Sequence, residues 1–263
     1  MPSRNADAAA SRRFSLLAYD IAWEQAGVGP KHPALATPSP GATLEERDVL
    51  ARQAMDELAT AGLVHRGRVD TDLLDTWVVL ARAKREYYGW FTPDGVGEHA
   101  VVVAAAGEDA VIGVTDGAAL ALTPIRPTAL TESLILALPE VAPARHRSIS
   151  VPRDAFDAVL HGSGDGGPVL VKAVGSTGRH DADARQLVDL LRGPRRGGGQ
   201  FFAACRDRLG VRIRSRRCLN YLDTTHGRTL LTEAPSGDGR SWVLAVAGGD
   251  RQFADQLDRL SRD

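Results

Sequence analysis

The sequence predicts a mixed α+β fold: a central, mainly antiparallel sheet with flanking helical bundles. Short β-favouring runs follow one another at turn signals, which is typical of a meander of antiparallel strands. Helices with one apolar stripe precede and follow each set of strands. The order of one strand, three helices, four strands and one helix occurs twice, which predicts a quasi-two-fold internal repeat with halves at about residues 13–138 and 145–262.

Composition places the chain among ordinary globular proteins. Its 263 residues are 43% hydrophobic and 25% charged, with a formal net charge of −1. A protein whose main ligand is nucleic acid usually needs a strongly basic face, so this balance argues against one. Residues 1–12 are polar and read as a disordered tail, and they lack the apolar core of a signal peptide. With no membrane-length apolar run, we expect a cytoplasmic protein.

The first half starts with a short strand at residues 14–18 and a helix at residues 21–26, which Asp20 is expected to cap. Thr43 and Glu46 then form a capping box at the start of the next helix. Gly62 ends that helix, Asp70 caps a third one, and Pro127 opens the helix that closes this half. Turn signals between the third and fourth helices separate four predicted strands, at residues 86–92, 99–105, 110–115 and 119–124.

The second half repeats this order after a Pro/Ala connector at residues 139–144. Gly197 to Gly199 are interpreted as a linker that enters the first strand of the second meander. Asp250 is expected to cap the last helix. The predicted elements are a strand at 147–151, helices at 152–160, 168–174 and 181–191, and strands at 200–208, 212–223, 228–233 and 241–247.

A gapless alignment of the two halves supports the repeat. Residues 79–91 lie over residues 190–202 with a leucine, a basic pair and an aromatic pair in register. The two helix caps Asp70 and Asp181 fall at the same offset. We interpret this as a pseudo-two-fold structure in which the two meanders pair and so remove exposed sheet edges.

No residue set predicts catalysis, a cofactor or a metal site. The glycine-rich segment 162–167 matches a dinucleotide fingerprint only in spacing, because it follows a helix instead of a strand. No two of the seven histidines have the spacing of a metal site, and no nucleophile elbow occurs. Cys205 and Cys218 lie on neighbouring predicted strands and are expected to be small core residues. We therefore expect a protein that is not an enzyme.

Two features predict contact with a partner. Arg212, Arg214 and Arg216 alternate, so they would share one face of a strand, either solvated or available to an acidic partner. The neighbours Trp90 and Phe91 point to opposite faces of their strand, so one of them is expected to be exposed. Charge is polarised along the chain, with 12 basic and 17 acidic residues before residue 131 and 20 basic and 16 acidic after it.

The chain resembles the EspG family, the cytosolic chaperones of actinobacterial type VII (ESX) secretion, over residues 13–262. The order and spacing of several motifs carry the resemblance, because no single one is diagnostic. The motifs are Phe14-Ser-Leu-Leu17, Trp23-Glu-Gln-Ala-Gly-Val28, Gly41-Ala-Thr-Leu-Glu-Glu-Arg47 continuing to Leu58-Ala-Thr-Ala-Gly-Leu63, Arg147-Ser-Ile-Ser-Val-Pro152, Gly199-Gln-Phe201, Arg206-Asp-Arg208, and Leu222-Asp-Thr224 continuing to Gly227-Arg228.

The resemblance implies a chaperone without a cofactor. It would bind the helical tip of a PPE or PPE-like protein, usually within a PE–PPE pair, keep it soluble and deliver it for export, as in helix-in-groove recognition. The loop between the first two strands of the first meander contributes to partner contact in this family, and here it spans Thr92 to Glu98. The candidate partner-binding residues are Trp90, Phe91, Thr92, Val96, Glu98, Val211, Arg212, Ile213 and Arg214. A homodimer is left open.

Two other classes of protein remain as alternatives. Residues 43–91 run helix, helix, strand, loosely like a winged-helix regulator, but they hold seven basic and nine acidic residues. The candidate recognition helix starts with Asp70, Asp72 and Asp75, which would repel phosphate. An enzyme whose site assembles only in three dimensions would leave no motif in the sequence.

Overall fold

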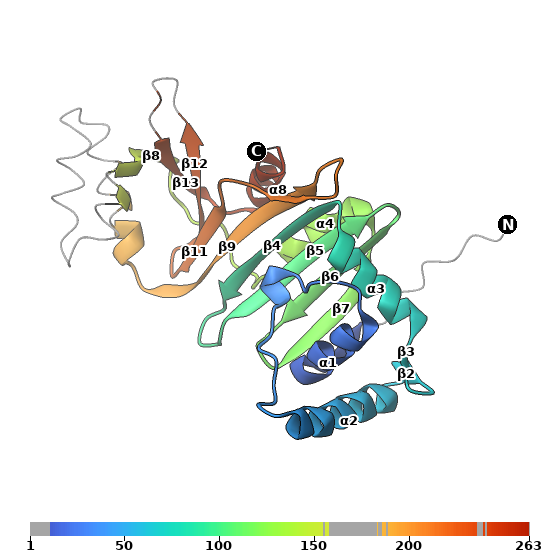
Figure 1. The fold of residues 1–263 in the computed structure, drawn as a ribbon. Coiled ribbons are helices and arrows are strands. Elements are labelled where there is room, and N and C mark those ends of the chain that lie inside the picture. The colour runs from blue at the N-terminus through green and yellow to red at the C-terminus, as the bar shows by residue number, and fades with distance from the viewer. Residues whose placement is uncertain are drawn as a thin grey trace. The chain divides into compact units, whose positions relative to one another are not determined.

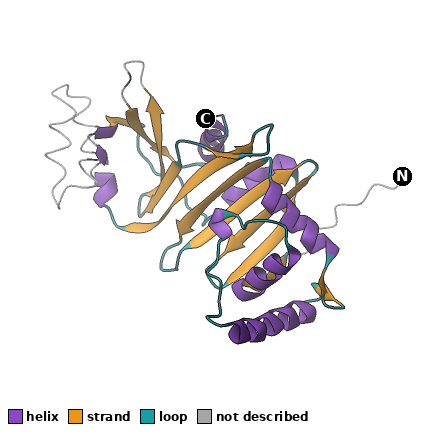
Figure 2. Cartoon of the chain, viewed as in Figure 1, coloured by secondary structure: helices purple, strands orange, loops and turns teal. Residues whose placement is uncertain are grey.

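A computed structural model of the chain describes residues 11–154, 156–157, 183, 186–187, 189–235, 239 and 241–262. The fold is mixed α+β with a large antiparallel sheet and flanking helices, as predicted (Figures 1 and 2). The described chain forms two compact units. The first comprises residues 11–90, 97–137 and 203–214, and the second comprises residues 91–96, 138–202 and 215–262 where described. Strand β9 (Arg195–Arg206) contributes to both units, so the units differ from the halves predicted from sequence.

The first unit carries a sheet with strand order β1-β7-β6-β5-β4, in which β1 pairs with β7 and the others form the predicted meander. Its elements are β1 (Arg12–Ser15), α1 (Leu16–Ala26), η1 (Pro33–Leu35), α2 (Leu44–Thr60), β2 (Val64–His65), β3 (Arg68–Val69), α3 (Thr71–Arg82), β4 (Arg85–Thr92, to Trp90), β5 (His99–Ala106), β6 (Asp109–Thr115), β7 (Ala119–Ile125), η2 (Pro127–Ala129), α4 (Leu130–Leu136), the end of β9 and β10 (Arg212–Arg214).

Burial explains why the strands of the first unit read as apolar runs. Residues 100–105 of β5 are all buried, and because successive side chains point to opposite faces, both faces of β5 are covered. Helices α3 and α4 both pack on β5 and β6. Trp77 of α3 is fully buried, with ring centroids 5.6 to 6.5 Å from those of Phe14, Tyr19 and Trp23, so an aromatic cluster fixes α1 and α3 on the sheet.

The second unit has strand order β9-β11-β12-β13-β8, and the last strand of its meander again pairs with the strand that precedes the meander. The ring of Phe201 stacks on Tyr221 at 5.9 Å and meets Phe253 edge-on at 5.6 Å, which holds the C-terminal helix on the sheet. Besides residues 195–202 of β9, the elements are β8 (Ile149–Pro152), β11 (Leu219–Thr224), β12 (Gly227–Pro235), β13 (Ser241–Ala247) and α8 (Asp250–Leu260).

Most boundaries set by local chemistry are confirmed. Thr43 and Glu46 form the capping box of α2, and the Asp70 side chain accepts hydrogen bonds from the N–H groups of Asp72 and Leu73 at the start of α3. Strands β4 to β7 lie within one residue of their predicted ends at every boundary, and β13 matches its prediction.

Several local predictions were wrong. Ser15, not Asp20, caps α1, because its hydroxyl accepts the Ala18 N–H and the helix begins earlier. Gly249, not Asp250, is the N-cap of α8. The predicted strand 212–223 is broken at residues 215–218, so Arg216 does not share a strand face with Arg212. Cys205 is exposed and Cys218 is half-buried, and both are free thiols.

Several predictions fall outside the described residues. These are the tail up to residue 10, the glycine-rich segment 162–167, the helix at 168–174 and parts of the helices at 152–160 and 181–191. The winged-helix interpretation of residues 43–91 finds no separate module, because β4 is a strand of the larger sheet. None of the described helices is long and apolar enough to cross a membrane.

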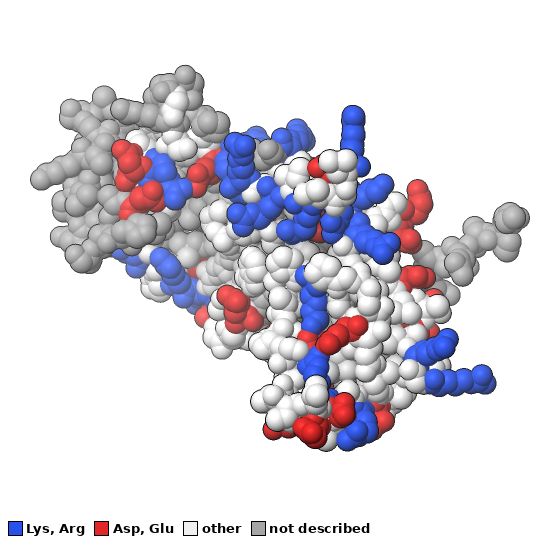
Figure 3. Space-filling model, viewed as in Figure 1, with Lys and Arg blue, Asp and Glu red and all other residues white. Residues whose placement is uncertain are grey.

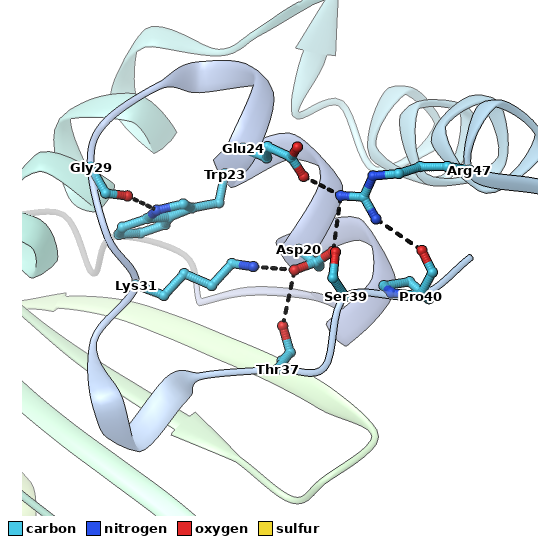
Figure 4. A network of polar contacts seen from close by, with 9 residues as sticks. All are labelled: Asp20, Trp23, Glu24, Gly29, Lys31, Thr37, Ser39, Pro40 and Arg47. Atoms are coloured by element: carbon cyan, nitrogen blue, oxygen red, sulfur yellow. Dashed lines mark hydrogen bonds and ion pairs between the residues drawn. The ribbon is translucent and has the colours of Figure 1, made fainter. Parts of the chain in front are cut away.

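A buried carboxylate ties the loop at residues 27–43 to α1 (Figure 4). Asp20 is 1% exposed and pairs with Lys31 from the loop, while the Thr37 and Ser39 hydroxyls donate to it at 3.3 and 3.4 Å. Arg47 of α2 pairs with both Asp20 and Glu24. One carboxylate therefore positions the loop between α1 and α2.

Replacement of Asp20 by asparagine is expected to destabilise the first unit by roughly 3 kcal/mol, because Lys31 and Arg47 lose their buried counter-charge. The freed loop should be cut by trypsin after Lys31 much faster than in the wild-type protein. Asp48→Asn, at an exposed position of α2, is the matched control and should leave the cleavage rate unchanged. Equal rates in all three proteins would show that the Asp20 network does not hold the loop.

Each unit also buries a tyrosine whose hydroxyl has no hydrogen-bond partner among the described residues, Tyr19 in the first and Tyr221 in the second. Burial raises the pKa of both phenols far above the usual value of about 10, and the nearby Asp20 raises that of Tyr19 further. A raised folded-state pKa contributes stability below the unfolded pKa that is lost as pH rises.

We therefore expect the protein to lose stability progressively above about pH 10, where the unfolded phenols ionise. The double variant Tyr19→Phe/Tyr221→Phe should unfold at higher pH than the wild-type protein. Circular dichroism, recorded together with tyrosinate absorbance during alkaline titration, measures both midpoints. If the wild-type protein and the double variant unfold at the same pH, the two buried tyrosines do not cause the loss of stability at high pH.

Candidate functional site

A hollow of about 520 Å³ lies in the second unit, where the turn after β4 meets β9 and β11. The turn is closed by the Val96 N–H, which donates to the Pro93 carbonyl, and Gly95 has the positive φ that this turn needs. Val96 is 53% exposed at this turn, so an apolar side chain faces solvent at the rim. The lining residues are Thr92, Pro93, Asp94, Gly95, Val96, Arg195, Arg196, Gly197, Gly198, Gly199, Asn220, Tyr221 and Leu222.

Glycines make the floor of the hollow. The interpretation of Gly197 to Gly199 as a linker was wrong, because all three lie within β9 and pair with β11. A Cβ at Gly197 would lie 2.7 Å from the Thr92 carbonyl oxygen, and one at Gly198 would lie 3.0 Å from the Tyr221 carbonyl oxygen. The absence of side chains therefore lets the turn after β4 approach β9 and leaves backbone exposed in the hollow.

The rim of the hollow is basic. Arg195 and Arg196 are exposed at the start of β9, and the Arg196 guanidinium lies 4.0 Å from the Asp94 carboxylate, a contact between exposed groups. Exposed pairs of this kind contribute little to stability. The guanidinium groups at this rim are thus suited to bind acceptor groups brought by another molecule.

Trp90 and Phe91 differ in exposure, but the prediction that one of them would be exposed was wrong. Phe91 is 3% exposed, whereas Trp90 is half-buried and packs edge-on against Tyr88. Trp90 and Glu98 line a second, smaller cavity of about 160 Å³ in the first unit, together with Tyr19 and Leu35. Partner contact through the buried Phe91 would require its side chain to move, so we assign its main role to packing.

The segment at residues 211–214 lies in the first unit, on the hairpin formed by the end of β9 and β10. Val211 and Ile213 are more than half exposed. Arg212 points the other way: its Nε donates to the buried Glu86 carboxylate at 2.6 Å, and its guanidinium lies 4.9 Å from the Tyr88 ring centroid. Arg212 is therefore half-buried, and its pairing with Glu86 holds β10 against β4.

The structure thus divides the predicted residues between surfaces of different kinds. Thr92 and Val96 meet at the hollow, Trp90 and Glu98 meet at the smaller cavity, and Val211 with Ile213 faces solvent on the hairpin. The candidate residues chosen from the sequence did not include Arg195, Arg196 or the glycine floor. The available signal was an arginine pair directly before three glycines. Within the described chain, no group of three His, Cys, Asp or Glu side chains has the arrangement of a metal site.

Residues 15–259 match the family model described as the EspG family, so the chain belongs to the EspG family, a family of type VII secretion chaperones and not of enzymes. The structure is similar to that of the Mycobacterium tuberculosis type VII secretion system chaperone EspG5, which was solved in complex with a PE25–PPE41 dimer. The TM-score is 0.70, with 15% sequence identity over 95% of each chain. No curated protein matches the sequence.

Proposed function

We propose that this protein is a cytosolic chaperone that binds the helical tip of a PPE-type protein, within a PE–PPE pair, and delivers the pair to type VII secretion. The observation that carries the proposal is the 520 Å³ hollow with exposed Val96 at its rim. The fold that this chain shares with EspG5, which was solved in complex with a PE25–PPE41 dimer, supports it.

The chemistry of the hollow matches that of a helical tip. The tip of a helical hairpin presents apolar side chains together with the unpaired carbonyl groups at the end of one helix. Val96 offers apolar contact, and the glycine floor allows close approach of backbone. Arg195 and Arg196 can donate to the carbonyl end of the helix, which carries a partial negative charge.

Such binding would keep the partner soluble without any covalent reaction. Apolar side chains at a free tip would otherwise associate with one another, and their burial on the chaperone removes them from water. Thr92 and Val96 are proposed as contacts at the hollow, Trp90 and Glu98 at the smaller cavity, and Val211, Ile213 and Arg214 on the hairpin.

We further propose that the two four-strand meanders descend from a duplicated unit. In each, the last strand of the meander pairs with a strand that comes before the whole meander in the chain: β7 pairs with β1, and β13 pairs with β8. In each, a helix follows the meander, α4 in one case and α8 in the other. This shared connectivity supports the repeat predicted from the sequence.

Co-expression with the PE–PPE pairs of the source organism tests the proposed function. We expect one pair to co-purify with the protein in a stable complex and to be insoluble without it. If every PE–PPE pair fails to co-purify and gains no solubility, the proposed function is wrong.

A further inference from the structure

Three apolar side chains are exposed on the hairpin at residues 205–214 of the first unit. Leu209 is 88% exposed, and Val211 and Ile213 are 56% and 51% exposed. They are three of the eight large hydrophobic residues exposed in the described chain, within five residues. Leu209 and Val211 belong to the turn and Ile213 lies on β10, so this apolar stripe extends from the turn onto the first residues of the strand.

Internal hydrogen bonds fix the shape of this hairpin. The Asp207 carboxylate accepts the N–H groups of Leu209 and Val211, both at 2.9 Å, and Gly210 takes the positive φ of the turn. The Arg206 guanidinium donates to the carbonyls of Gly210 and Ala81. The exposed stripe is therefore held in one conformation before any partner arrives, which lowers the entropic cost of binding.

The net charge of the hairpin is positive. Residues 206–214 hold four arginines and one aspartate. The two carboxylates near the stripe are used internally, Asp207 by the turn and Glu86 by Arg212. Figure 3 shows basic side chains gathered over the β9–β10 hairpin with little red among them. Exposed Arg208 and Arg214 therefore border the apolar stripe.

The positive charge of the hairpin favours one kind of binding partner over the others. A second copy paired on the same stripe would bring the arginines of two hairpins together, which is unfavourable. An anionic membrane would bind an apolar turn without carboxylates, but here Asp207 places a carboxylate in the turn itself, and Ile213 extends the apolar stripe onto β10. An acidic protein surface with apolar residues fits both the charge and the stripe.

We propose that the β9–β10 hairpin binds acidic side chains that flank apolar residues on the PE–PPE pair, and so selects among pairs by charge. This inference rests on the proposed function. It adds Arg208 and Leu209 to the contact surface and removes from it Arg212, whose guanidinium is paired with Glu86.

The test measures the affinity of hairpin variants for the pair that co-purifies with the wild-type protein, by calorimetry at two salt concentrations. We expect Arg208→Glu and Leu209→Asp each to weaken binding about tenfold or more, and Arg208→Lys to bind nearly as the wild type does. Affinity of the wild type should fall with salt, more steeply than that of Arg208→Glu. The matched controls are Arg68→Glu on β3 and Leu44→Asp at the start of α2, both exposed, and neither should change the affinity.

Wild-type affinity in Arg208→Glu and Leu209→Asp would overturn the inference and leave the proposed function standing. Failure of the wild-type protein to bind any pair would overturn both. Two other results would also overturn it: binding of the wild type to phosphatidylglycerol vesicles that Arg208→Glu loses, and a dimer in light scattering that Ile213→Glu dissociates.

Discussion

Replacement of Asp223 by alanine is expected to destabilise the second unit by roughly 3 to 5 kcal/mol. Asp223 and Arg228 are each 3% exposed, and two parallel hydrogen bonds of 2.8 Å join the guanidinium to the carboxylate. Arg228 also donates to the Pro139 carbonyl and lies 4.5 Å from the Tyr221 ring centroid. Without the carboxylate, a buried cation keeps only neutral partners.

Thermal unfolding measures this effect, and a shift of about 6 to 20 °C follows from that loss for a chain of this size. Asp255→Ala, at an exposed position of α8, is the matched control and should stay within about 0.5 kcal/mol of the wild type. In a double-mutant cycle, Arg228→Ala should cost much less in the Asp223→Ala background than alone. Additive effects of the two replacements would show that the pair is not coupled.

Replacement of Val96 by aspartate is expected to weaken binding of the PE–PPE pair at least tenfold, which corresponds to about 1.4 kcal/mol. The new carboxylate would be buried against apolar side chains and close to the negatively polarised end of a helix. Val96 is 53% exposed, so the replacement should leave thermal unfolding nearly unchanged.

The matched control is Val49→Asp on α2, where the valine is 55% exposed and is not among the residues that line the hollow. It should bind the pair with wild-type affinity. Equal affinities of the two variants would remove Val96 from the contact surface.

Predictions that depend on neighbouring residues were the most accurate. The Thr43 capping box and the Asp70 cap involve groups two or three residues apart, so the sequence contains both partners. Strands β4 to β7 were placed closely because glycine-containing turns separate apolar runs. The family resemblance pointed to the loop at Thr92 to Glu98, and the structure shows that this loop borders a hollow.

Features that depend on distant pairing were missed. Glycine disfavours strands, so Gly197 to Gly199 read as a linker, and only the approach of the Thr92 carbonyl explains why glycine is needed there. Arg212 read as a surface residue because its partner Glu86 lies 126 positions away. Strand alternation predicted that one of Trp90 and Phe91 would be exposed, but Trp90 is half-buried and Phe91 is buried.

Hydrogen–deuterium exchange of the protein, alone and in complex with its PE–PPE pair, tests most directly whether the hollow and the hairpin bind the partner. We predict slower exchange at residues 92–98, 195–199 and 207–214 in the complex, and unchanged exchange in α2. A stable complex in which these three segments exchange as in the free protein, with protection confined to α2 or other surfaces, would contradict the account.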